Sequence, residues 1–435
     1  MIWNRERETA SRADLGGLQC ERLRHQVAYV YQRVPFYRQA LDGAGVQPEQ
    51  IRSLDDVRRL PFTYKRDFRE HYPFGLLAIP RQEVVRVHGS SGTTGKPTVV
   101  AYSANDMAMW REVCARNMTA AGISADDTVQ VSMGYGLFTG GLGWHQAAEQ
   151  IGATIVPLSS GNTQRQIMLL QDFETTVICC TPSYAIYLAE KAGELGVDLR
   201  ESRLRVGIHG AEPWSEGMRR EIGARLGIDP IDTYGMSELV GPGVSGECTE
   251  HCGLHINEDH FLAEVIDPES EEVLPWGSSG ELVITTLTKE ALPVLRYRTG
   301  DITRLDPSPC ACGRSLARME RISGRSDDML IVRGVNVFPS QVETVLLRVK
   351  GIQPHYQIIV DRAKGAMDDL EVWVEVSPEL FSDDIGGLTG LRREVEYEMR
   401  ETLGIQVRCK LVEPNSIERC VGKAKRVIDR RDVYS

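Results

Sequence analysis

Short apolar runs alternate with helical patterns between residues 35 and 240, and this alternation narrows the possible folds more than any other feature of the chain. The strand-like runs lie at Thr128–Val131, 151–156, Val177–Cys180 and 204–208. Residues 215–226 carry one of the intervening helical patterns. Alternation of this kind predicts a mostly parallel sheet with helices packed on it, which is an α/β fold.

The pattern changes near residue 260 and again near residue 326. Short strands separated by Gly, Pro and Asp follow the first change and predict a small antiparallel sheet or barrel. An α+β pattern follows the second. A chain of 435 residues is too long for one core. We therefore expect a large N-terminal α/β domain at 1–326, with a small β-barrel-like part at about 245–320, and a small C-terminal α+β domain at 327–435.

A glycine- and hydroxyl-rich loop reads HGSSGTTGKP over residues 88–97. Its glycines let backbone N–H groups approach an anion closely, and its hydroxyls and lysine add donors and a positive charge. Strand-like runs on both sides predict a phosphate-gripping loop between two strands. The Walker A pattern is excluded, because it needs a glycine at Ser90 and a hydroxyl residue at Pro97. The residues expected to hold phosphate are Ser90, Ser91, Gly92, Thr93, Thr94, Gly95 and Lys96.

Two later motifs directly follow strand patterns. The first is Gly210-Ala211-Glu212-Pro213, and the second is Asp232-Thr233-Tyr234-Gly235-Met236-Ser237-Glu238. Ligands of open α/β sheets bind at the carboxyl ends of the strands, where such motifs lie. The second motif offers an aromatic face, a hydroxyl and a carboxylate, and an oxygen ligand such as Glu238 suits Mg²⁺.

Two more short motifs lie further along the chain. Asp301 follows a tight turn and suits a ribose diol, and Lys423 lies between Gly422 and Ala424. Taken in order, these segments resemble the core motifs of the adenylate-forming acyl-CoA synthetase superfamily over nearly the whole chain. The matching segments are 90–97, 234–238, 298–301, 324–328 and 422–424. The short chain and the segments 133–138, 210–213 and 333–339 resemble the phenylacetate–CoA ligase branch.

The resemblance implies an acid–thiol ligase that joins an aryl acid to CoA in two half-reactions. The acid and ATP first give an acyl-adenylate and pyrophosphate, and the thiol of CoA then displaces AMP. ATP, Mg²⁺ and CoA are therefore implied. The resemblance also implies that the C-terminal domain is mobile, with Asp327 as its hinge and Lys423 as the catalytic lysine of adenylation.

The same resemblance implies roles for the nucleotide-binding residues. Tyr234 stacks on adenine, Glu238 binds Mg²⁺, and Asp301 and Arg325 hold the ribose. Further residues implied around the adenine and ribose are Gly210, Ala211, Glu212, Pro213, Asp232, Gly235, Met236 and Ser237.

An acid pocket is implied along Tyr135, Gly136 and Phe138, with Gly210 and Ala211 opposite. Aromatic and small residues suit a flat ring. No Arg or Lys lies in the segment to pair with a second carboxylate, so we expect an aryl monoacid. Phenylacetate is the first choice, and benzoate-type and indoleacetate-type acids follow. The alternative is that the two aromatic residues are simply core.

Two cysteine-rich segments lie about sixty residues apart, at 248–255 and 310–313. Short spacings between Cys and His in a chain without expected disulfides suggest Zn²⁺. The candidate ligands are Cys248, His251, Cys252, His255, Cys310 and Cys312. Resemblance to the branch favours Cys248, His255, Cys310 and Cys312 as a closed structural site, and reduced thiols without metal are the alternative.

The net charge of −11 argues against a nucleic-acid partner. No apolar run approaches the roughly 20 residues of a membrane span, and the charged start of the chain does not resemble a signal peptide. We therefore expect a cytoplasmic protein with small-molecule partners, and a homodimer as in other members of the branch. Two alternatives stay open: AMP transfer to a deazaflavin, as in coenzyme F390 synthetases, and a nucleotide- or zinc-binding protein without catalysis.

Overall fold

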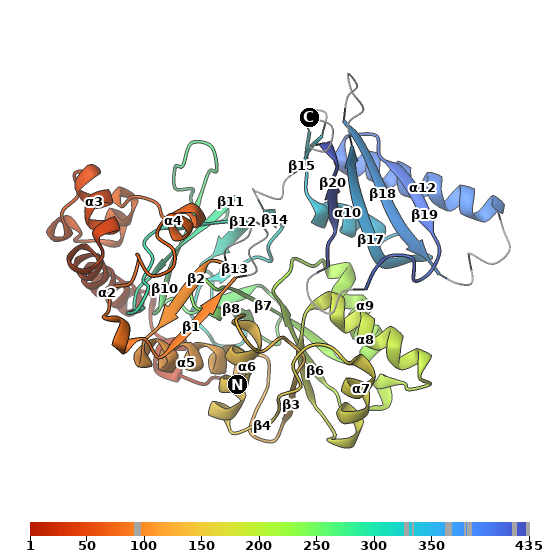
Figure 1. Ribbon diagram of the computed structural model, residues 1–435, viewed down its shortest axis with the longest axis horizontal. Helices are drawn as coiled ribbons and strands as arrows, with labels where there is room; N and C mark the ends of the chain where they lie inside the picture. Colours follow the sequence, from red (N-terminus) through yellow and green to blue (C-terminus); the bar gives the residue numbers. More distant parts are fainter. Residues whose placement is uncertain are drawn as a thin grey trace. The chain divides into compact units, whose positions relative to one another are not determined.

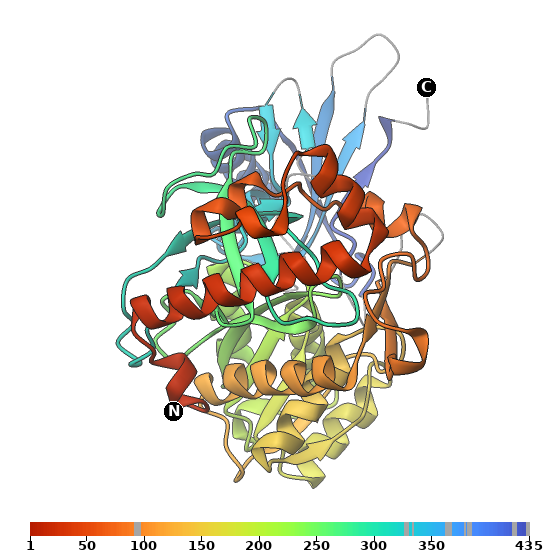
Figure 2. The same ribbon diagram turned by 90° about the vertical axis from the view of Figure 1, so that its left-hand side faces the viewer.

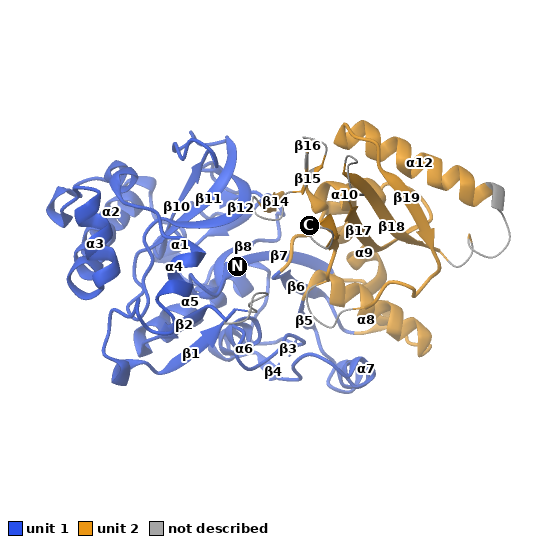
Figure 3. Cartoon of the chain, turned by 45° about the horizontal axis from the view of Figure 1, so that its top comes forward, with its two compact units in different colours: residues 1–180, 203–211, 229–321 blue, residues 181–202, 212–228, 322–435 orange. Residues whose placement is uncertain are grey.

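The computed structural model describes residues 1–90, 97–325, 330–332, 335–361, 368–377, 380, 385–419 and 424–431. Two compact units make up the chain (Figure 3). Unit 1 comprises residues 1–180, 203–211 and 229–321, and unit 2 comprises residues 181–202, 212–228 and 322–435.

One long sheet runs through unit 1 in the order β10-β11-β12-β13-β9-β8-β7-β6-β5-β3-β4 (Figure 1). Strands β4, β3, β5, β6 and β7 pair in parallel, and β7 to β13 pair with their neighbours antiparallel. The strands are β3 Thr128–Val131, β4 Thr154–Val156, β5 Val177–Cys180, β6 Val206–Gly210, β7 Asp229–Met236, β8 Gly241–Glu247, β9 Leu254–Ile256, β10 Phe261–Ile266, β11 Ser279–Thr286, β12 Tyr297–Asp306 and β13 Arg318–Met319. The α/β fold class is thereby confirmed, and the expected antiparallel strands continue the parallel sheet.

Helices and short 3₁₀ turns surround this sheet. The α-helices of unit 1 are α1 Arg5–Glu8, α2 Arg12–Arg33, α3 Pro35–Gly43, α4 Lys65–Glu70, α5 Ala104–Ala120, α6 Gly140–Ile151 and α7 Thr163–Asp172, and its 3₁₀ helices are Pro48–Gln50, Leu54–Arg59 and Arg81–Glu83. Helix α5 begins at a capping box, in which Asp106 N–H donates to Ser103 Oγ at 3.0 Å and Ser103 N–H donates to Asp106 Oδ2 at 2.9 Å. Residues 113–120 of α5 are all buried, so this helix belongs to the core. Figure 2 shows α2 in red and α5 in orange.

A two-stranded hairpin flanks the predicted phosphate loop. Strand β1 (Arg86–Gly89) pairs antiparallel with β2 (Val99–Tyr102), and Gly89 lies opposite Val99. The two expected strands are therefore present, and residues 90–98 join their paired ends. Residues 91–96 of this loop lie outside the described residues.

Unit 2 is built around a four-stranded sheet in the order β19-β18-β17-β20. Its elements are α8 Pro182–Glu194, a 3₁₀ turn at Leu199–Glu201, α9 Glu216–Leu226, β14 Gly324–Arg325, β15 Leu330–Val332, β16 Val335–Val337, α10 Pro339–Leu346, β17 Ile352–Asp361, β18 Asp369–Val376, α12 Ile385–Leu403, β19 Arg408–Val412 and β20 Val427–Asp429. Valines dominate the core between the sheet, α10 and α12. No described helix is long and apolar enough to cross a membrane.

Helices α8 and α9 lie with the C-terminal part of the chain, although the sequence placed residues 181–228 in the N-terminal domain. Polar contacts connect them: Glu190 of α8 lies 2.6 Å from His355 Nε2, and Arg225 of α9 donates to Gln353 at 2.8 Å. Arg419 donates to Glu190 at 3.2 Å. Such long-range partners leave no periodic pattern in a sequence. The predicted domain boundary after residue 326 stays a prediction.

Candidate active site

The carboxyl ends of β6 and β7 lie side by side and bring two predicted motifs together. Gly210 ends β6 and pairs with Thr233 of β7. A Cβ atom at Gly210 would lie 2.4 Å from the carbonyl oxygen of Thr233, so only glycine fits here. Ala211 follows with a positive φ of 70°. Residues 210–211 and 232–236 therefore share one edge of the parallel sheet, as the motifs predicted. The strands extend further than expected, because Gly210 ends β6 and residues 232–236 belong to β7.

Tyr234 and Asp301 are 67 residues apart in sequence and in direct contact. The hydroxyl of Tyr234 donates to Asp301 Oδ2 at 2.7 Å. The backbone of Asp301 is also fixed, because its N–H donates to Thr299 Oγ1 at 3.0 Å. Both residues are buried. The residue that the resemblance assigned to adenine thus lies beside one that it assigned to the ribose.

Asp232 lies in a network of charged groups. Its N–H donates to Glu247 Oε2 at 2.8 Å, and its carboxylate accepts from Arg321 Nε at 3.1 Å. Arg321 also lies 3.7 Å from Glu247. Further along β7, position 235 requires a glycine, because a Cβ at Gly235 would lie 2.0 Å from the Gly241 oxygen of β8.

Glu238 follows β7 and is buried, and one oxygen of its carboxylate lacks a hydrogen-bond partner among the described residues. It is 2% exposed, and its Oε1 has no hydrogen-bond partner among the residues that the structure describes. An unpaired buried carboxylate oxygen is costly, and a cation ligand would satisfy it. The donor set therefore fits Mg²⁺. Met236 and Ser237, half-buried before it, complete the motif, and Ser237 Oγ lies 3.3 Å from Thr139 Oγ1.

Lys289 is a neighbour of Glu238 that the sequence did not single out. It is 1% exposed, and its ammonium donates to the backbone oxygen of Glu238 at 3.3 Å. Burial lowers the pKa of Lys289 to about 8, against the opposing effect of Asp106 and Glu238. The ammonium also lies 5.1 Å from the ring centre of Tyr102. A lysine within the mostly apolar run at 284–295 was the available signal.

The phosphate loop and the C-terminal motifs are described only in part. Ser90 N–H donates to Thr98 O at 3.0 Å. Arg325 is half-buried in β14. Ser91, Gly92, Thr93, Thr94, Gly95, Lys96, Asp327 and Lys423 lie outside the described residues.

In unit 2, Glu212 of the motif at 210–213 is hydrogen-bonded to Ala424, the residue after Lys423. The carboxylate of Glu212 accepts from Ser183 N–H at 2.7 Å and from Ala424 N–H at 3.0 Å. Pro213, which follows, is exposed. Glu212 thus contacts the segment of the predicted catalytic lysine.

The predicted acid-pocket residues lie between β3 and α6. The hydroxyl of Tyr135 lies 3.2 Å from His145 Nδ1, and His145 Nε2 lies 3.2 Å from Glu149 Oε1. Burial raises the pKa of Tyr135. Gly136 has a φ of 120°, and Phe138 is 49% exposed. This exposure contradicts the alternative that Phe138 is a core residue.

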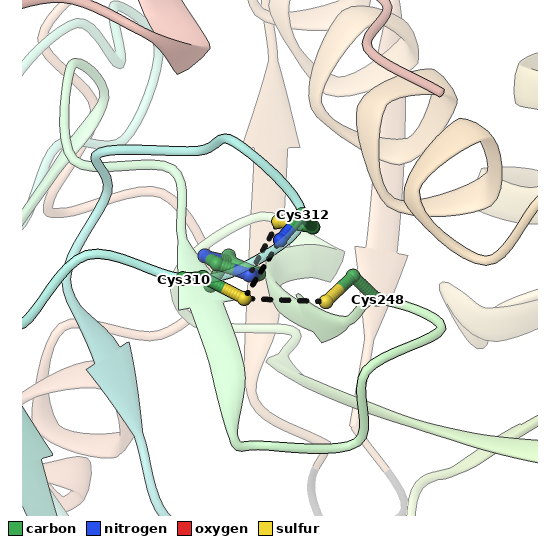
Figure 4. Close-up of side chains that lie close together, drawn as sticks. Cys248, Cys310 and Cys312 are labelled. Carbon is green, nitrogen blue, oxygen red and sulfur yellow. Dashed lines mark hydrogen bonds between the residues drawn. The ribbon is translucent and has the colours of Figure 1, made fainter.

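Four of the candidate metal ligands converge in unit 1. The ligand atoms of Cys248, His255, Cys310 and Cys312 all lie within 4.8 Å of one another. Figure 4 shows the three cysteines drawn together from two segments of the chain. The sulfurs of Cys248 and Cys310 are 3.8 Å apart, and Cys312 Sγ lies 3.5 Å from His255 Nε2. Tetrahedral zinc with Zn–S bonds of about 2.3 Å would separate two sulfurs by about 3.8 Å.

The other two candidate ligands lie differently. Cys252 is exposed, with its sulfur 3.3 Å from Cys310 Sγ. His251 Nε2 lies 2.8 Å from Asp229 Oδ1. The geometry therefore favours the set of four that the resemblance implied.

Comparisons with known proteins show which family the chain belongs to. A family model described as AMP-binding enzyme matches residues 54–288, and one described as AMP-binding enzyme C-terminal domain matches residues 334–431. A phenylacetate–coenzyme A ligase of Thermus thermophilus is 51% identical over 99% of this chain and 100% of its own length. The chain belongs to the AMP-binding enzyme family. A second phenylacetate–coenzyme A ligase, from Aromatoleum evansii, is 50% identical over 98% of this chain and 96% of its own length.

A solved structure shows the same architecture. The crystal structure of 2-hydroxyisobutyryl-CoA ligase, in the postadenylation state with R3-HIB-AMP, has a TM-score of 0.94 and 32% identity. The match covers 100% of this chain and 93% of that one. The chain is thus a member of the phenylacetate–CoA ligase branch and an AMP-forming aryl acid–CoA ligase. Enzymes of this class use ATP, Mg²⁺ and CoA, and their partners are small molecules.

Proposed function

We propose that the acid used by this enzyme is phenylacetate, which it converts with ATP and CoA to phenylacetyl-CoA, AMP and pyrophosphate. The observation that carries the proposal is the identity of 47% to 51% to four phenylacetate–coenzyme A ligases, over 98% or more of this chain. The half-exposed aromatic ring of Phe138 and the tethered ring of Tyr135 support an aryl substrate.

The first half-reaction places negative charge on the α-phosphate of ATP, so donors and cations aimed at it are the main catalytic resource. We propose that Tyr234 and Asp301 bind the adenosine of ATP, and that residues 90–96 bind its β- and γ-phosphates. Mg²⁺, held by Glu238, would neutralise phosphate charge. The unpaired buried oxygen of Glu238 supports this role. Lys423 supplies the cation for the α-phosphate.

In the second half-reaction, the CoA thiol attacks the acyl carbon, a C–S bond forms, and AMP leaves with the bonding electrons. We infer that Lys423 serves only the first half-reaction, and that Asp327 is the hinge between the two states. Within unit 2, Glu212 accepts a hydrogen bond from Ala424, the residue that follows Lys423.

A screen for acid-dependent AMP release over phenylacetate, benzoate and indoleacetate, with and without CoA, tests the substrate. We expect the highest kcat/KM with phenylacetate and loss of the adenylate only when CoA is added. Release of pyrophosphate with transfer of AMP onto a deazaflavin, without acid or CoA, would instead favour the F390-type alternative. A higher kcat/KM for one of the other acids would refute phenylacetate.

The variant Lys423→Ala tests the assignment of the catalytic lysine. We expect adenylation to slow by roughly 10²–10³-fold, the usual loss for one donor to a developing anion. Thioester formation from preformed phenylacetyl-adenylate should be nearly unchanged. Equal damage to both half-reactions would contradict the assignment.

We also propose a structural Zn²⁺ at Cys248, His255, Cys310 and Cys312. The four converging donors support it, and a closed set of four leaves no open position for catalysis. Protein washed with a weak chelator should retain about one zinc per chain. Cys310→Ser should lose it, and the neighbouring Cys252→Ser should keep it. Zinc loss in neither variant, or in both, would contradict this ligand set.

We propose further that the enzyme is a cytoplasmic homodimer, as the resemblance to the branch suggests. Light scattering of the purified full chain measures its mass directly, and a monomer would contradict the proposal. Fractionation of the producing cells tests the location.

A further inference from the structure

A cavity of about 380 Å³ lies in unit 1, and none of its lining residues is among those assigned above to nucleotide and acid. It opens between β1, α5 and α6, and the two helices pack side by side (Figure 1). Its lining residues are Arg86 of β1, Met107 and Arg111 of α5, and Gln146, Glu149 and Gln150 of α6. The lining is thus mostly polar, with two guanidinium groups.

The two arginines of this cavity lack acidic partners. Within the described ranges, no carboxylate lies within 4.0 Å of Arg86 or Arg111, although most arginines of the chain's described part have one. Gln146, with its amide oxygen turned toward Arg86, accepts from it at 3.3 Å, which orients the guanidinium without neutralising it. Burial lowers the pKa of Arg86, and the like charge of Arg111 lowers it further. Two cations held near each other, one of them partly buried, attract an anion.

The remaining charge in the wall is Glu149. Its carboxylate lies 3.2 Å from His145 Nε2 and is 57% exposed. Two arginines against one glutamate leave a net positive cavity in a chain whose net charge is −11. The positive potential is therefore a local feature of these three elements.

We propose that this cavity binds a phosphate group, held by Arg86 and Arg111 with the amides of Gln146 and Gln150. Planar guanidinium groups match phosphate oxygens, and neutral amides add donors without repelling an anion. The group belongs to a free anion such as inorganic phosphate or pyrophosphate, or to the 3′-phosphate of CoA. Both carry the same oxygens and negative charge.

Strand β1 connects this site directly to the phosphate loop. Strand β1 runs from Arg86 to Gly89 and continues into Ser90. Gly89 N–H donates to the Leu137 oxygen at 2.8 Å, so the end of the strand is also tied to the acid-pocket segment. An anion that fixes Arg86 therefore fixes the strand that carries the loop.

Binding of inorganic phosphate to the full chain, measured by titration calorimetry with MgATP saturating the nucleotide site, tests the proposal. We expect Arg111→Gln and Arg86→Gln each to weaken phosphate binding on the order of tenfold, the usual loss for a charge-assisted hydrogen bond. Glu149→Gln should tighten it about two- to fivefold, because a repelling charge disappears. Arg165→Gln removes an exposed arginine of α7 and should change nothing.

The source of the phosphate group follows from kinetics with CoA and dephospho-CoA. If Arg111→Gln raises KM for CoA and not for dephospho-CoA, the site holds the 3′-phosphate. If it leaves both KM values unchanged while phosphate binding weakens, the site holds a free anion. Arg111 is exposed, so this variant keeps the fold, and thermal unfolding verifies Arg86→Gln. Equal phosphate affinity in wild type, Arg111→Gln and Glu149→Gln, or no binding in wild type, would overturn the proposal.

Discussion

His260 should make the stability of unit 1 fall in mild acid. Its side chain is mostly buried, 12% exposed, with Nε2 3.2 Å from Asp259 Oδ2, and its Nδ1 lies 2.7 Å from Thr288 Oγ1. Arg116 and Arg22 also surround Asp259, and Arg116 holds it at 2.7 Å. Burial lowers the pKa of His260 to about 4, although Asp259 opposes the shift. The ring is therefore neutral in the folded protein at neutral pH.

The sign of the effect follows from proton uptake. An unfolded histidine titrates near pH 6.5 and the folded one near 4, so between these values only the unfolded chain binds the proton. Stability is therefore fully present above about pH 6.5 and falls by about 1.4 kcal/mol for each pH unit below it. From pH 7.5 to 5 the loss from this group is about 2 kcal/mol. Asp259, whose pKa is lowered, adds a loss only in stronger acid.

The variant His260→Asn isolates this contribution, because asparagine can still reach Thr288 and does not titrate. Urea unfolding at pH 7.5, 6 and 5, followed by tryptophan fluorescence, gives the free energy of unfolding at each pH. We expect the variant to be less stable at pH 7.5, through lost packing, and to lose about 2 kcal/mol less than wild type on going to pH 5. His25→Asn, at an exposed position, should behave as wild type. An equal loss in His260→Asn and wild type would refute the reasoning.

Two further variants probe the nucleotide site. Tyr234→Phe removes the 2.7 Å hydrogen bond to buried Asp301, and steady-state kinetics should show KM for ATP raised about fivefold to tenfold with a smaller change in kcat; an unchanged KM would contradict a role of this pair in adenosine binding. Gly210→Ala brings a Cβ to 2.4 Å from the Thr233 oxygen, so the edge of the sheet must shift. Pyrophosphate exchange should fall by at least about tenfold while the thermal midpoint drops by only a few degrees, and full exchange activity would show that the edge does not position the nucleotide.

Local patterns were enough to predict the architecture and the order of the motifs. The runs at Thr128–Val131 and Val177–Cys180 are strands at the same residues in the structure. Burial on both faces makes a parallel strand a continuous apolar run, so its sequence reports its position in the sheet.

Contacts between distant residues could not be predicted in this way. Nothing near Asp232 in the sequence shows that Arg321 neutralises it, and nothing near Lys289 shows that it approaches Glu238. The division of the chain into units depends equally on long-range contacts such as that of Arg225 with Gln353. Periodicity reports which side of an element is buried, and it carries no information on which partner lies there.

A buried carboxylate needs hydrogen-bond donors. Of three carboxylates at this site, Glu238 is the one with an oxygen that lacks a donor among the described residues. Asp232 is paired with Arg321, and Asp301 accepts from Tyr234, so each buried carboxylate has a donor. Glu238 has an oxygen without one in the described part of the chain. Since an unsatisfied buried carboxylate destabilises the fold, such a position persists where a ligand supplies the missing charge. The proposed role of Glu238 as a Mg²⁺ ligand accounts for this oxygen, because a bound cation would supply the partner that the described residues do not.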